Sequence, residues 1–354
     1  MSLAERLAAQ IRVGGPMTIA QFMTACLHDP KDGYYATRPA LGAEGDFITA
    51  PLVSQMFGEL IGAWLVECWE RLGRPTPFRL VEIGPGDGTL MSDILRLARL
   101  APDFAAAADL WLVEVSAPLH EAQRRRLEGG PVAPKWAAAL SEVPGGAPLL
   151  LVANELLDCL PVRQYLMTPQ GWAERLVGLD AAGGLAFGYT PSPGAGPSEA
   201  PQGAVFERSP AQEAVGAELG ARIVRDGGAA LLIDYGRDRP EFGDTLQALK
   251  RHQKVDVLTC PGAADLTVHA DFPAVLSAAR GAGAATHITT QGEFLLRLGL
   301  DQRAAALARA RPDRAAELAR QRERLAAPDQ MGELFKAAVI ASPGWPVPAF
   351  EEPA

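Results

Sequence analysis

Cysteine is scarce in this 354-residue sequence, and the four that are present lie far apart, at Cys26, Cys68, Cys159 and Cys260. No two of them share the short spacing of a zinc-ligand pair, and their wide separation does not indicate a disulfide framework. We therefore expect reduced thiols, as in a cytosolic protein, and no metal site.

Long apolar runs and an excess of positive charge are also missing. The opening segment MSLAERLAAQIRVGG carries charges every few residues and has no apolar stretch long enough for a signal peptide or a membrane-spanning helix. The net charge is -9 at pH 7, so the average surface does not attract nucleic acid or anionic membranes. We expect a cytoplasmic protein with no membrane span and no nucleic-acid partner.

The sequence does contain a series of short apolar runs separated by helical stretches. These runs cover residues 79–84, 110–115, 147–157, 228–236, 284–290 and 335–342. Near-continuous apolar strands that alternate with helices are typical of a parallel sheet covered by helices on both faces. The pattern predicts an α/β fold with a doubly wound, mostly parallel sheet.

Composition divides the chain further. Residues 1–75 are expected to form a mainly helical segment with one long loop, and within it residues 54–73 have the apolar spacing of a buried helix. Residues 161–203 contain apolar runs between breakers and end in a Pro- and Gly-rich stretch, which predicts an inserted β element followed by a flexible loop. The sheet domain then comprises residues 76–160 and 204–354, with helical additions towards the C-terminus.

A glycine-rich turn follows the first apolar run, within the stretch LVEIGPGDGTLMSDIL. Gly84, Gly86 and Gly88 tolerate positive φ and let a ligand approach the backbone, as expected for a binding turn between a strand and a helix. The dinucleotide fingerprint G-x-G-x-x-G does not fit, because Thr89 occupies the position of its last glycine. The spacing favours S-adenosylmethionine over NAD as the ligand.

Three acidic residues near this turn are candidates for cofactor binding. Glu114 lies at the end of the second apolar run, where a carboxylate can accept hydrogen bonds from both ribose hydroxyls. Asp87 could pair with the cofactor's amino group or cap the helix that begins near Thr89. Glu82 could contact the cofactor or could organise the turn by accepting hydrogen bonds from backbone N–H groups.

Segments along almost the whole chain resemble the bacterial members of the MidA-type family, which is related to the mitochondrial complex I assembly factor that is a protein arginine methyltransferase. The resembling segments are DGYYATRPALGAEGDFITAP, SQMFGEL, LVEIGPGDGTLMSDIL, NELLDCLPVRQY, LLIDYG, DLTVHADF, TQGEFLLRLG and MGELFK. The resemblance implies a class I, Rossmann-like methyltransferase fold that uses S-adenosylmethionine and carries an added substrate region. It also implies a protein substrate that presents an arginine, with a subunit of respiratory complex I as the target. The sequence leaves open whether the protein is a homodimer.

The loop at residues 29–51 is long enough to act as a binding element. Within it, Phe47 and Thr49 could fold over the cofactor as part of a lid, or could pack onto the sheet edge. The residue that follows the proline of TAP is usually acidic in the family and is Leu52 here. This departure puts a catalytic or ligand role for that position in doubt.

The stretch NELLDCLPVRQY follows the third apolar run, at the sheet edge where substrate is expected to meet cofactor. A guanidinium substrate is protonated and planar, so it needs carboxylates that orient it and polarise one nitrogen. We favour Glu155 and Asp158 for this role and assign Asn154 to the cofactor. The alternative is that Asn154 and Asp158 cap a helix at the strand end.

His269 and Asp271, in DLTVHADF, are expected on the same side of an extended segment, because alternate residues of a strand face together. They could form a histidine oriented by a carboxylate for proton removal, or a hydrogen-bonded structural pair.

Three other functions stay open beside arginine methylation. The protein could act as an assembly factor mainly by binding its client, it could methylate a small molecule, or, as the least favoured option, it could be an NAD-dependent oxidoreductase.

Overall fold

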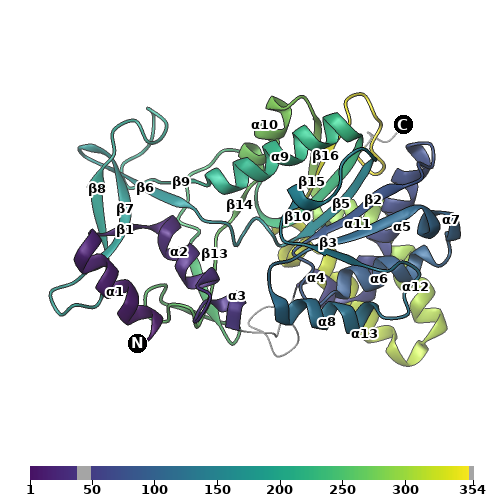
Figure 1. The fold of residues 1–354 in the computed structure, drawn as a ribbon, viewed down its shortest axis with the longest axis horizontal. Coiled ribbons are helices and arrows are strands. Elements are labelled where there is room, and N and C mark those ends of the chain that lie inside the picture. The colour runs from purple at the N-terminus through teal and green to yellow at the C-terminus, as the bar shows by residue number, and fades with distance from the viewer. Residues whose placement is uncertain (38–48, 351–354) are drawn as a thin grey trace. The chain divides into compact units, whose positions relative to one another are not determined.

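The computed structural model describes residues 1–37 and 49–350, and the chain divides into two compact units. The N-terminal unit comprises residues 1–47, 157–214 and 239–273, and the sheet unit comprises residues 48–156, 215–238 and 274–354. Figure 1 follows the chain through both by colour. Each unit is therefore assembled from three segments that are distant in the sequence.

The sheet unit contains the expected α/β sheet. Its main strands are β2 (Phe78–Ile83), β3 (Ala108–Val113), β4 (Lys135–Ala137), β5 (Leu149–Asn154), β10 (Gly228–Arg237), β15 (Ala285–Thr290) and β16 (Phe335–Ala341). They are ordered β15-β16-β10-β5-β2-β3-β4. The pairs from β10 to β4 are parallel, whereas β16 is antiparallel to both of its neighbours. This order confirms the doubly wound, mostly parallel prediction.

The strand order reverses at β2, because the chain continues from β2 to β3 on one side and returns to β5 on the other. In open α/β sheets, ligands bind beyond the carboxyl ends of the strands at this switch point. The turns after β2, β3 and β5 therefore form the expected ligand-binding edge of the sheet.

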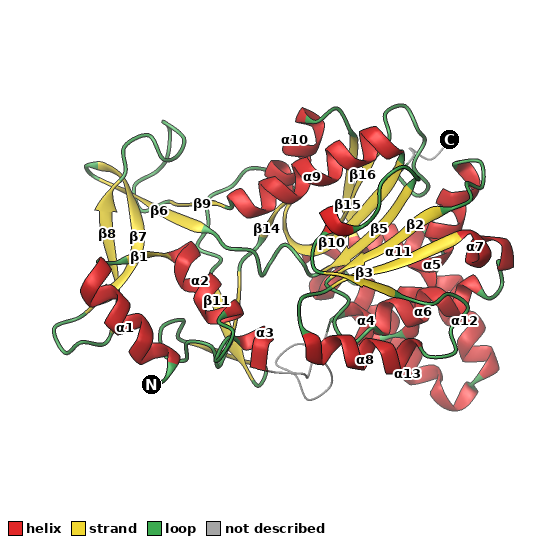
Figure 2. Ribbon diagram, in the orientation of Figure 1, coloured by secondary structure: helices red, strands yellow, loops and turns green. Residues whose placement is uncertain are grey.

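Helices cover both faces of this sheet (Figure 2). They are α4 (Ala50–Val53), α5 (Gln55–Arg71), α6 (Thr89–Ala98), α7 (Pro102–Ala107), α8 (Ala117–Leu127), α11 (Gln291–Arg297), α12 (Leu300–Ala310) and α13 (Ala315–Ala326). Two more, α9 (Pro210–Asp226) and α10 (Phe272–Gly281), begin in the N-terminal unit and continue into the sheet unit. Every residue of β10 and β16 is buried, as expected for strands covered on both faces.

The predicted buried helix at residues 54–73 is α5, which Ser54 caps by accepting a hydrogen bond from the Met56 N–H at 3.3 Å. Its aromatic residues lie in the core with the central strands. Gly58 lets α6 approach closely, since a Cβ built there would lie 2.5 Å from the Asp93 Cβ. The aromatics of α5 thus belong to the core, as the spacing predicted.

The N-terminal unit is built around antiparallel strands. Its elements are α1 (Leu3–Gly14), β1 (Met17–Thr18), α2 (Ile19–His28), α3 (Tyr34–Thr37), β6 (Arg163–Thr168), β7 (Gly171–Leu179), β8 (Leu185–Pro191), β9 (Val205–Arg208), β11 (Gln247–Lys250), β12 (Gln253–Val255), β13 (Asp265–Thr267) and β14 (Ala270–Asp271). One antiparallel sheet has the order β1-β7-β6-β9 with β8 on β7, and a smaller one has the order β12-β11-β13. The predicted inserted β element is therefore present and pairs with the N-terminal strand β1.

Two features differ from the expected organisation. Residues 239–273 cluster with the N-terminal unit, whereas we expected residues 204–354 to belong to the sheet domain throughout. The Pro- and Gly-rich stretch after β8, expected to be a flexible loop, packs on Trp172. A Cβ built at Gly196 would lie 2.8 Å from that indole ring, and the Trp172 Nε1 donates to the Pro197 carbonyl at 3.0 Å. The indole supplies an apolar surface that the loop's own composition does not reveal.

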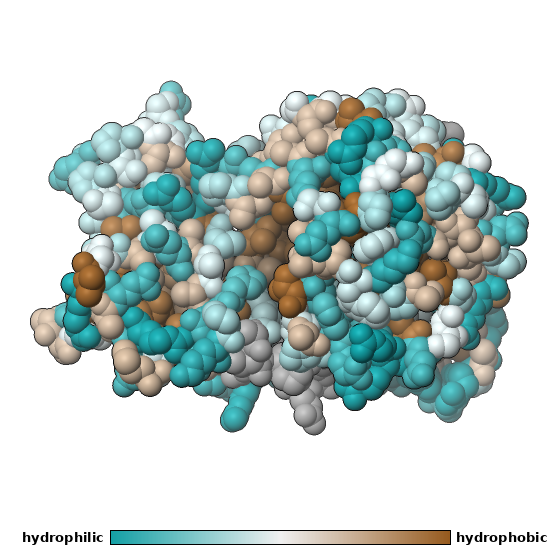
Figure 3. Space-filling view, viewed as in Figure 1, coloured by the Kyte–Doolittle hydropathy of each residue, from teal (hydrophilic) through white to brown (hydrophobic). Residues whose placement is uncertain are grey.

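Within the described residues, we find no helix that combines the length and the apolar character needed to cross a bilayer. The face visible in Figure 3 mixes hydrophilic and weakly hydrophobic residues, with strongly hydrophobic ones in small separate spots.

Candidate functional site

The glycine turn connects β2 to α6 and has the backbone conformation that only glycine adopts easily. Gly84, Gly86 and Gly88 have φ angles of 67°, 53° and 84°. The Gly84 N–H donates to the Val113 carbonyl at 3.1 Å, which ties the turn to the end of β3. A Cβ built at Gly84 would have one described neighbour within 4 Å, the Leu156 Cδ1 at 3.8 Å. The backbone of the turn can therefore be approached closely by a ligand.

Asp87 precedes Gly88, the N-cap residue of α6, and its side chain satisfies the first residue of that helix. Its Oδ1 accepts from the Thr89 N–H at 3.0 Å and from the Thr89 hydroxyl at 2.7 Å. Its Oδ2 pairs with the Arg126 guanidinium of α8 at 2.7 Å. Of the two roles considered for Asp87, these contacts support the capping role, and an interaction with the cofactor's amino group stays a prediction.

Glu82 is buried beside the turn without a complete set of partners. The residue is 2% exposed, and its Oε2 has no hydrogen-bond partner among the described residues. Burial and, secondarily, the negative charge of Asp87 raise the pKa of Glu82 to about 8. A cation placed here, such as the ammonium of an amino-acid ligand, would supply the missing partner.

Glu114 immediately follows β3 and organises the turn after that strand. Its Oε1 accepts from the N–H groups of Val115 and Ser116, both at 2.8 Å. Its Oε2 has a longer contact, 3.4 Å, with the Gln123 Nε2. A carboxylate can accept about four hydrogen bonds and three are made here, so Glu114 retains capacity for one further donor, such as a ribose hydroxyl. Burial raises the pKa of Glu114, although these donors oppose that shift.

Asn154 and Glu155 lie at the carboxyl end of β5. Asn154 is the last residue of the strand, and its buried Oδ1 has no hydrogen-bond partner among the described residues. Its Nδ2 donates to the Glu155 Oε1 at 3.2 Å. Glu155 has φ 52°, a left-handed conformation that is uncommon and costly for a residue other than glycine. Its N–H donates to the Ile233 carbonyl of β10 at 2.8 Å, which helps to hold this conformation.

Asp158, His269 and Asp271 belong to the N-terminal unit. The Asp158 carbonyl accepts from the Val268 N–H at 2.9 Å, so these segments are neighbours. The His269 N–H donates to the Thr245 hydroxyl, and the Asp271 N–H donates to the buried Gln212 Oε1. The four residues predicted to be catalytic are thus divided between the units, because Glu155 belongs to the sheet unit.

Two loop residues, Phe47 and Thr49, are predicted to cover the cofactor. Phe47 lies outside the described residues. Thr49 precedes α4 in the N-cap position, where its side chain makes no capping hydrogen bond. Its proposed contact with the cofactor stays a prediction.

Sequence reasoning missed Gln123, a fully buried residue of α8. Its amide contacts both the glycine turn and Glu114. The sequence held one signal, because His120, Gln123 and Arg126 are spaced three apart and so lie near one another on a helix. Nothing local indicated that this face would meet the turn.

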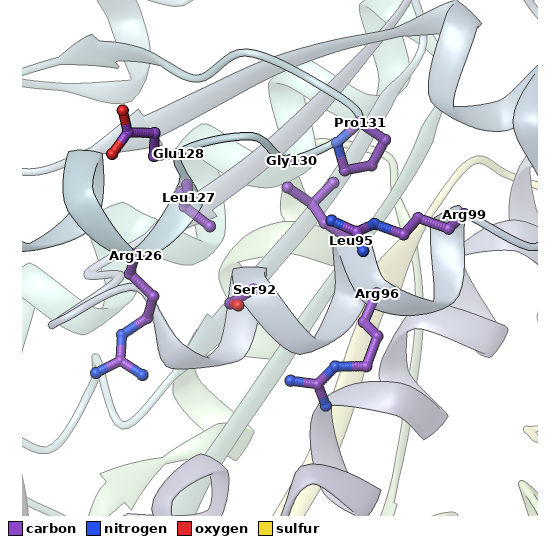
Figure 4. A pocket seen from close by; sticks show the side chains of 9 residues that line it. All are labelled: Ser92, Leu95, Arg96, Arg99, Arg126, Leu127, Glu128, Gly130 and Pro131. Carbon is purple, nitrogen blue, oxygen red and sulfur yellow. The ribbon is translucent and has the colours of Figure 1, made fainter.

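A cavity of about 220 Å³ lies beside α6 and α8. It is lined by Ser92, Leu95, Arg96, Arg99, Arg126, Leu127, Glu128, Gly130 and Pro131. Figure 4 shows the guanidinium groups of Arg96 and Arg126 extending to the same side, away from Glu128. Both arginines already pair with aspartates, Asp93 and Asp87 respectively. The lining includes no residue of the glycine turn, so we do not assign this cavity to the cofactor.

The residues of the sheet edge fit S-adenosylmethionine. The open glycine turn would approach the methionine portion, and the start of α6 would direct N–H groups and partial positive charge at its carboxylate. The unsatisfied Oε2 of Glu82 matches the ammonium group, and the remaining acceptor capacity of Glu114 matches the ribose. The Glu82 Oε2 supports this assignment most strongly, because a buried polar atom without a hydrogen-bond partner destabilises the folded protein.

Comparisons with known proteins agree with this fit. A family model described as S-adenosyl-L-methionine-dependent methyltransferase matches residues 60–290. The rat protein arginine methyltransferase NDUFAF7, mitochondrial, is 35% identical, with 99% of this chain and 91% of the rat protein covered. Its human counterpart is 36% identical, with 94% and 82% covered.

Two solved structures are also similar to this chain over almost its whole length. A Burkholderia thailandensis protein bound to S-adenosyl-homocysteine has a TM-score of 0.84 and 28% identity, with 99% of this chain and 92% of that chain covered. A second structure from that organism has a TM-score of 0.85 and 30% identity, with 99% and 94% covered. The chain therefore belongs to the family of S-adenosyl-L-methionine-dependent methyltransferases, and S-adenosyl-L-methionine is its cofactor.

Proposed function

We propose that the protein transfers the methyl group to the guanidinium of an arginine in a protein client. The observation that carries this proposal is Glu155, a carboxylate at the carboxyl end of a central strand in a left-handed backbone conformation. Such conformations persist where the surrounding structure enforces them, and they cluster at functional sites. The names of the relatives, which are protein arginine methyltransferases, support the same substrate class.

Methyl transfer requires the protein mainly to position the cofactor and the substrate nitrogen. When bound, the cofactor would supply a methyl group on a positively charged sulfur, and a nitrogen that attacks the methyl carbon in line would form the new bond as the carbon–sulfur bond breaks. The chain must hold a guanidinium nitrogen in position and accept the proton that the nitrogen loses. Glu155 can pair with the planar, charged guanidinium and orient one nitrogen. Asn154 donates to the Glu155 Oε1 and so limits the orientations of that carboxylate.

Asp158, His269 and Asp271 complete the proposal as residues of the N-terminal unit that would contact the client. The roles predicted from the sequence, Asp158 as a carboxylate for the guanidinium and His269 as acceptor of the released proton, stay predictions. The relationship of the MidA-type family to a complex I assembly factor supports a subunit of respiratory complex I as the client. A cytoplasmic location remains a prediction from the sequence, which leaves open whether the protein is a homodimer.

The test measures transfer of radiolabelled methyl groups into proteins extracted from cells that lack the enzyme. After acid hydrolysis we expect label in methylarginine. Glu155→Gln keeps the shape of the side chain and removes its charge, so turnover should fall about a hundredfold or more while the affinity for S-adenosylhomocysteine changes less than about threefold. Glu142→Gln, a change of an exposed glutamate in the same unit, serves as the matched control.

Other outcomes separate the alternative functions. Label in a small molecule would replace the arginine proposal with small-molecule methylation. Tight cofactor binding with no labelled product would favour an assembly factor that acts by binding. Full activity of Glu155→Gln would remove this residue from the mechanism.

A further inference from the structure

Gln123 of α8 connects two parts of the cofactor edge that come from different strands. Its side chain is 0% exposed. The Nε2 donates to the Gly86 carbonyl in the glycine turn at 2.8 Å, and it also lies 3.4 Å from the Glu114 Oε2. One amide group therefore contacts both the turn after β2 and the carboxylate after β3.

The orientation of this amide is fixed by a third contact. The Gln123 Oε1 accepts a hydrogen bond from the Trp136 Nε1 at 2.7 Å. An indole N–H can only donate, so the amide oxygen must face Trp136. The NH₂ group must then face the turn and Glu114, and its two hydrogens match the two acceptors there.

The backbone of α8 is also held against both strand ends. A Cβ built at Gly88 would lie 3.4 Å from the Gln123 Cα, so the helix packs directly on the turn. One turn earlier, the His120 Nε2 is 2.9 Å from the Glu114 carbonyl, and it must be the donor because a carbonyl only accepts. The spacing between the turn and Glu114 is therefore set from one rigid element.

We propose that Gln123 is a positioning residue that fixes the distance between the glycine turn and Glu114. This distance would then equal the distance between the methionine and ribose groups of the bound cofactor. Gln123 acts through Gly86 and Glu114 and does not itself need to touch the cofactor. Preorganised contacts of this kind lower the free energy lost to ordering when a ligand binds. The proposal rests on the assignment of Glu114 to the ribose.

The first test is Gln123→Leu, with affinity for S-adenosylhomocysteine measured by calorimetry. The substitution replaces the amide by an apolar side chain of similar size and removes all three hydrogen bonds, so affinity should fall about tenfold or more. Asp109→Asn is the matched control, because Asp109 lies at the opposite end of β3 and pairs there with Arg79. The control can lose stability, but its affinity should stay within about twofold of wild type. Equal losses of affinity in the two variants would overturn the proposal.

The second test separates positioning from simple support of the fold. In Gln123→Glu the oxygen that faces Trp136 is kept, but an ionised carboxylate would face Glu114 and the Gly86 carbonyl. Protonation restores one donor, so the affinity of this variant relative to wild type should recover as the pH falls from 8 to 6. Affinity relative to wild type that does not change with pH would contradict positioning through these two acceptors. His120 and Arg126 face the same region in both proteins and cancel in the comparison.

A double-mutant cycle then tests the coupling between Gln123 and Glu114 separately from the assignment of Glu114 to the ribose. If Gln123 acts through Glu114, the loss caused by Gln123→Leu should be clearly smaller in a Glu114→Gln background. Additive losses would overturn the coupling to Glu114. No effect of Glu114→Gln alone would instead overturn the ribose assignment on which the proposal depends.

Discussion

Two glutamates at the carboxyl ends of neighbouring parallel strands have opposite surroundings. Glu114, after β3, accepts two backbone hydrogen bonds at 2.8 Å and belongs to a satisfied network. Glu82, in β2, is almost fully buried and its Oε2 lacks a partner among the described residues. The register pairs Glu82 with Leu112, so Glu114 lies two residues further towards the carboxyl edge of the sheet, and the same side chain has two different environments there. We predict that Glu114 accepts hydrogen bonds from neutral hydroxyls of the cofactor, whereas Glu82 pairs with its positively charged ammonium group.

The largest effect is expected from the turn that separates the two glutamates. Gly86→Val puts a β-branched side chain at φ 53°, where it is strained, and fills the space through which the ligand approaches the backbone. Calorimetric titration with S-adenosylhomocysteine should show a loss of affinity of more than about a hundredfold. Gly129→Val is the control, since Gly129 has φ 70° but no neighbour within 4 Å of its Cβ position among the described residues. Equal affinity of the Gly86 variant and wild type would refute the turn assignment.

A smaller effect is expected from Glu114. Glu114→Gln keeps the shape of the side chain and removes the charge that strengthens hydrogen bonds from the ribose, so affinity for S-adenosylhomocysteine should fall about tenfold to a hundredfold. The exposed Glu121 of α8 pairs only with surface arginines in the structure, so Glu121→Gln provides the control. If both variants bind like wild type, the ribose must be held by other groups.

We expect Glu82 to contribute to the pH dependence of the stability of the cofactor-free protein. Its pKa is about 8 in the folded chain against an ordinary value of 4.5, so between these values the folded state holds a proton that the unfolded state has lost. The free energy of unfolding should therefore fall as the pH rises through this window, with a contribution of at most about 1.4 kcal/mol per pH unit. Urea unfolding between pH 5.5 and 7.5 measures the slope. Glu82→Gln should flatten it, and an unchanged slope would assign the titration to another group.

The smallest effect is expected from Arg126, which neutralises Asp87 beside the turn. The arginine is 43% exposed, and ion pairs at such sites contribute little. Arg126→Gln should reduce stability by less than about 1 kcal/mol and change cofactor affinity less than about threefold. Thermal unfolding and calorimetry measure the two quantities. A large loss of affinity would mean that Asp87 contacts the cofactor and needs this partner.

The sequence predicted the parts of the fold that depend on local patterns. The runs at residues 79–84 and 228–236 became β2 and β10, and the glycine turn has the positive φ angles that its composition implies. The strand β4 was not predicted, because Lys135–Ala137 is three residues long and has no apolar run. The antiparallel direction of β16 depends on connections across the sheet, which no local pattern encodes.

Parts of the site were beyond local patterns for the same reason. Gln123 precedes three arginines in the sequence and would be expected at the surface. Its burial follows from contacts with Gly86 and Trp136, which are 37 and 13 residues away. The left-handed conformation of Glu155 likewise depends on a hydrogen bond to β10, which lies far along the chain.

The position of the last strand has a consequence for biosynthesis. β16 is the last strand among the described residues, yet it lies inside the sheet between β10 and β15. A ribosome makes β10 and β15 before it makes residues 335–341, so neither strand can pair with β16 until those residues have been made. Until then both present unpaired edges, which are prone to associate with other chains. A nascent chain therefore exposes these edges until residues 335–341 leave the ribosome, and a stop codon shortly before β16 would leave the sheet open permanently.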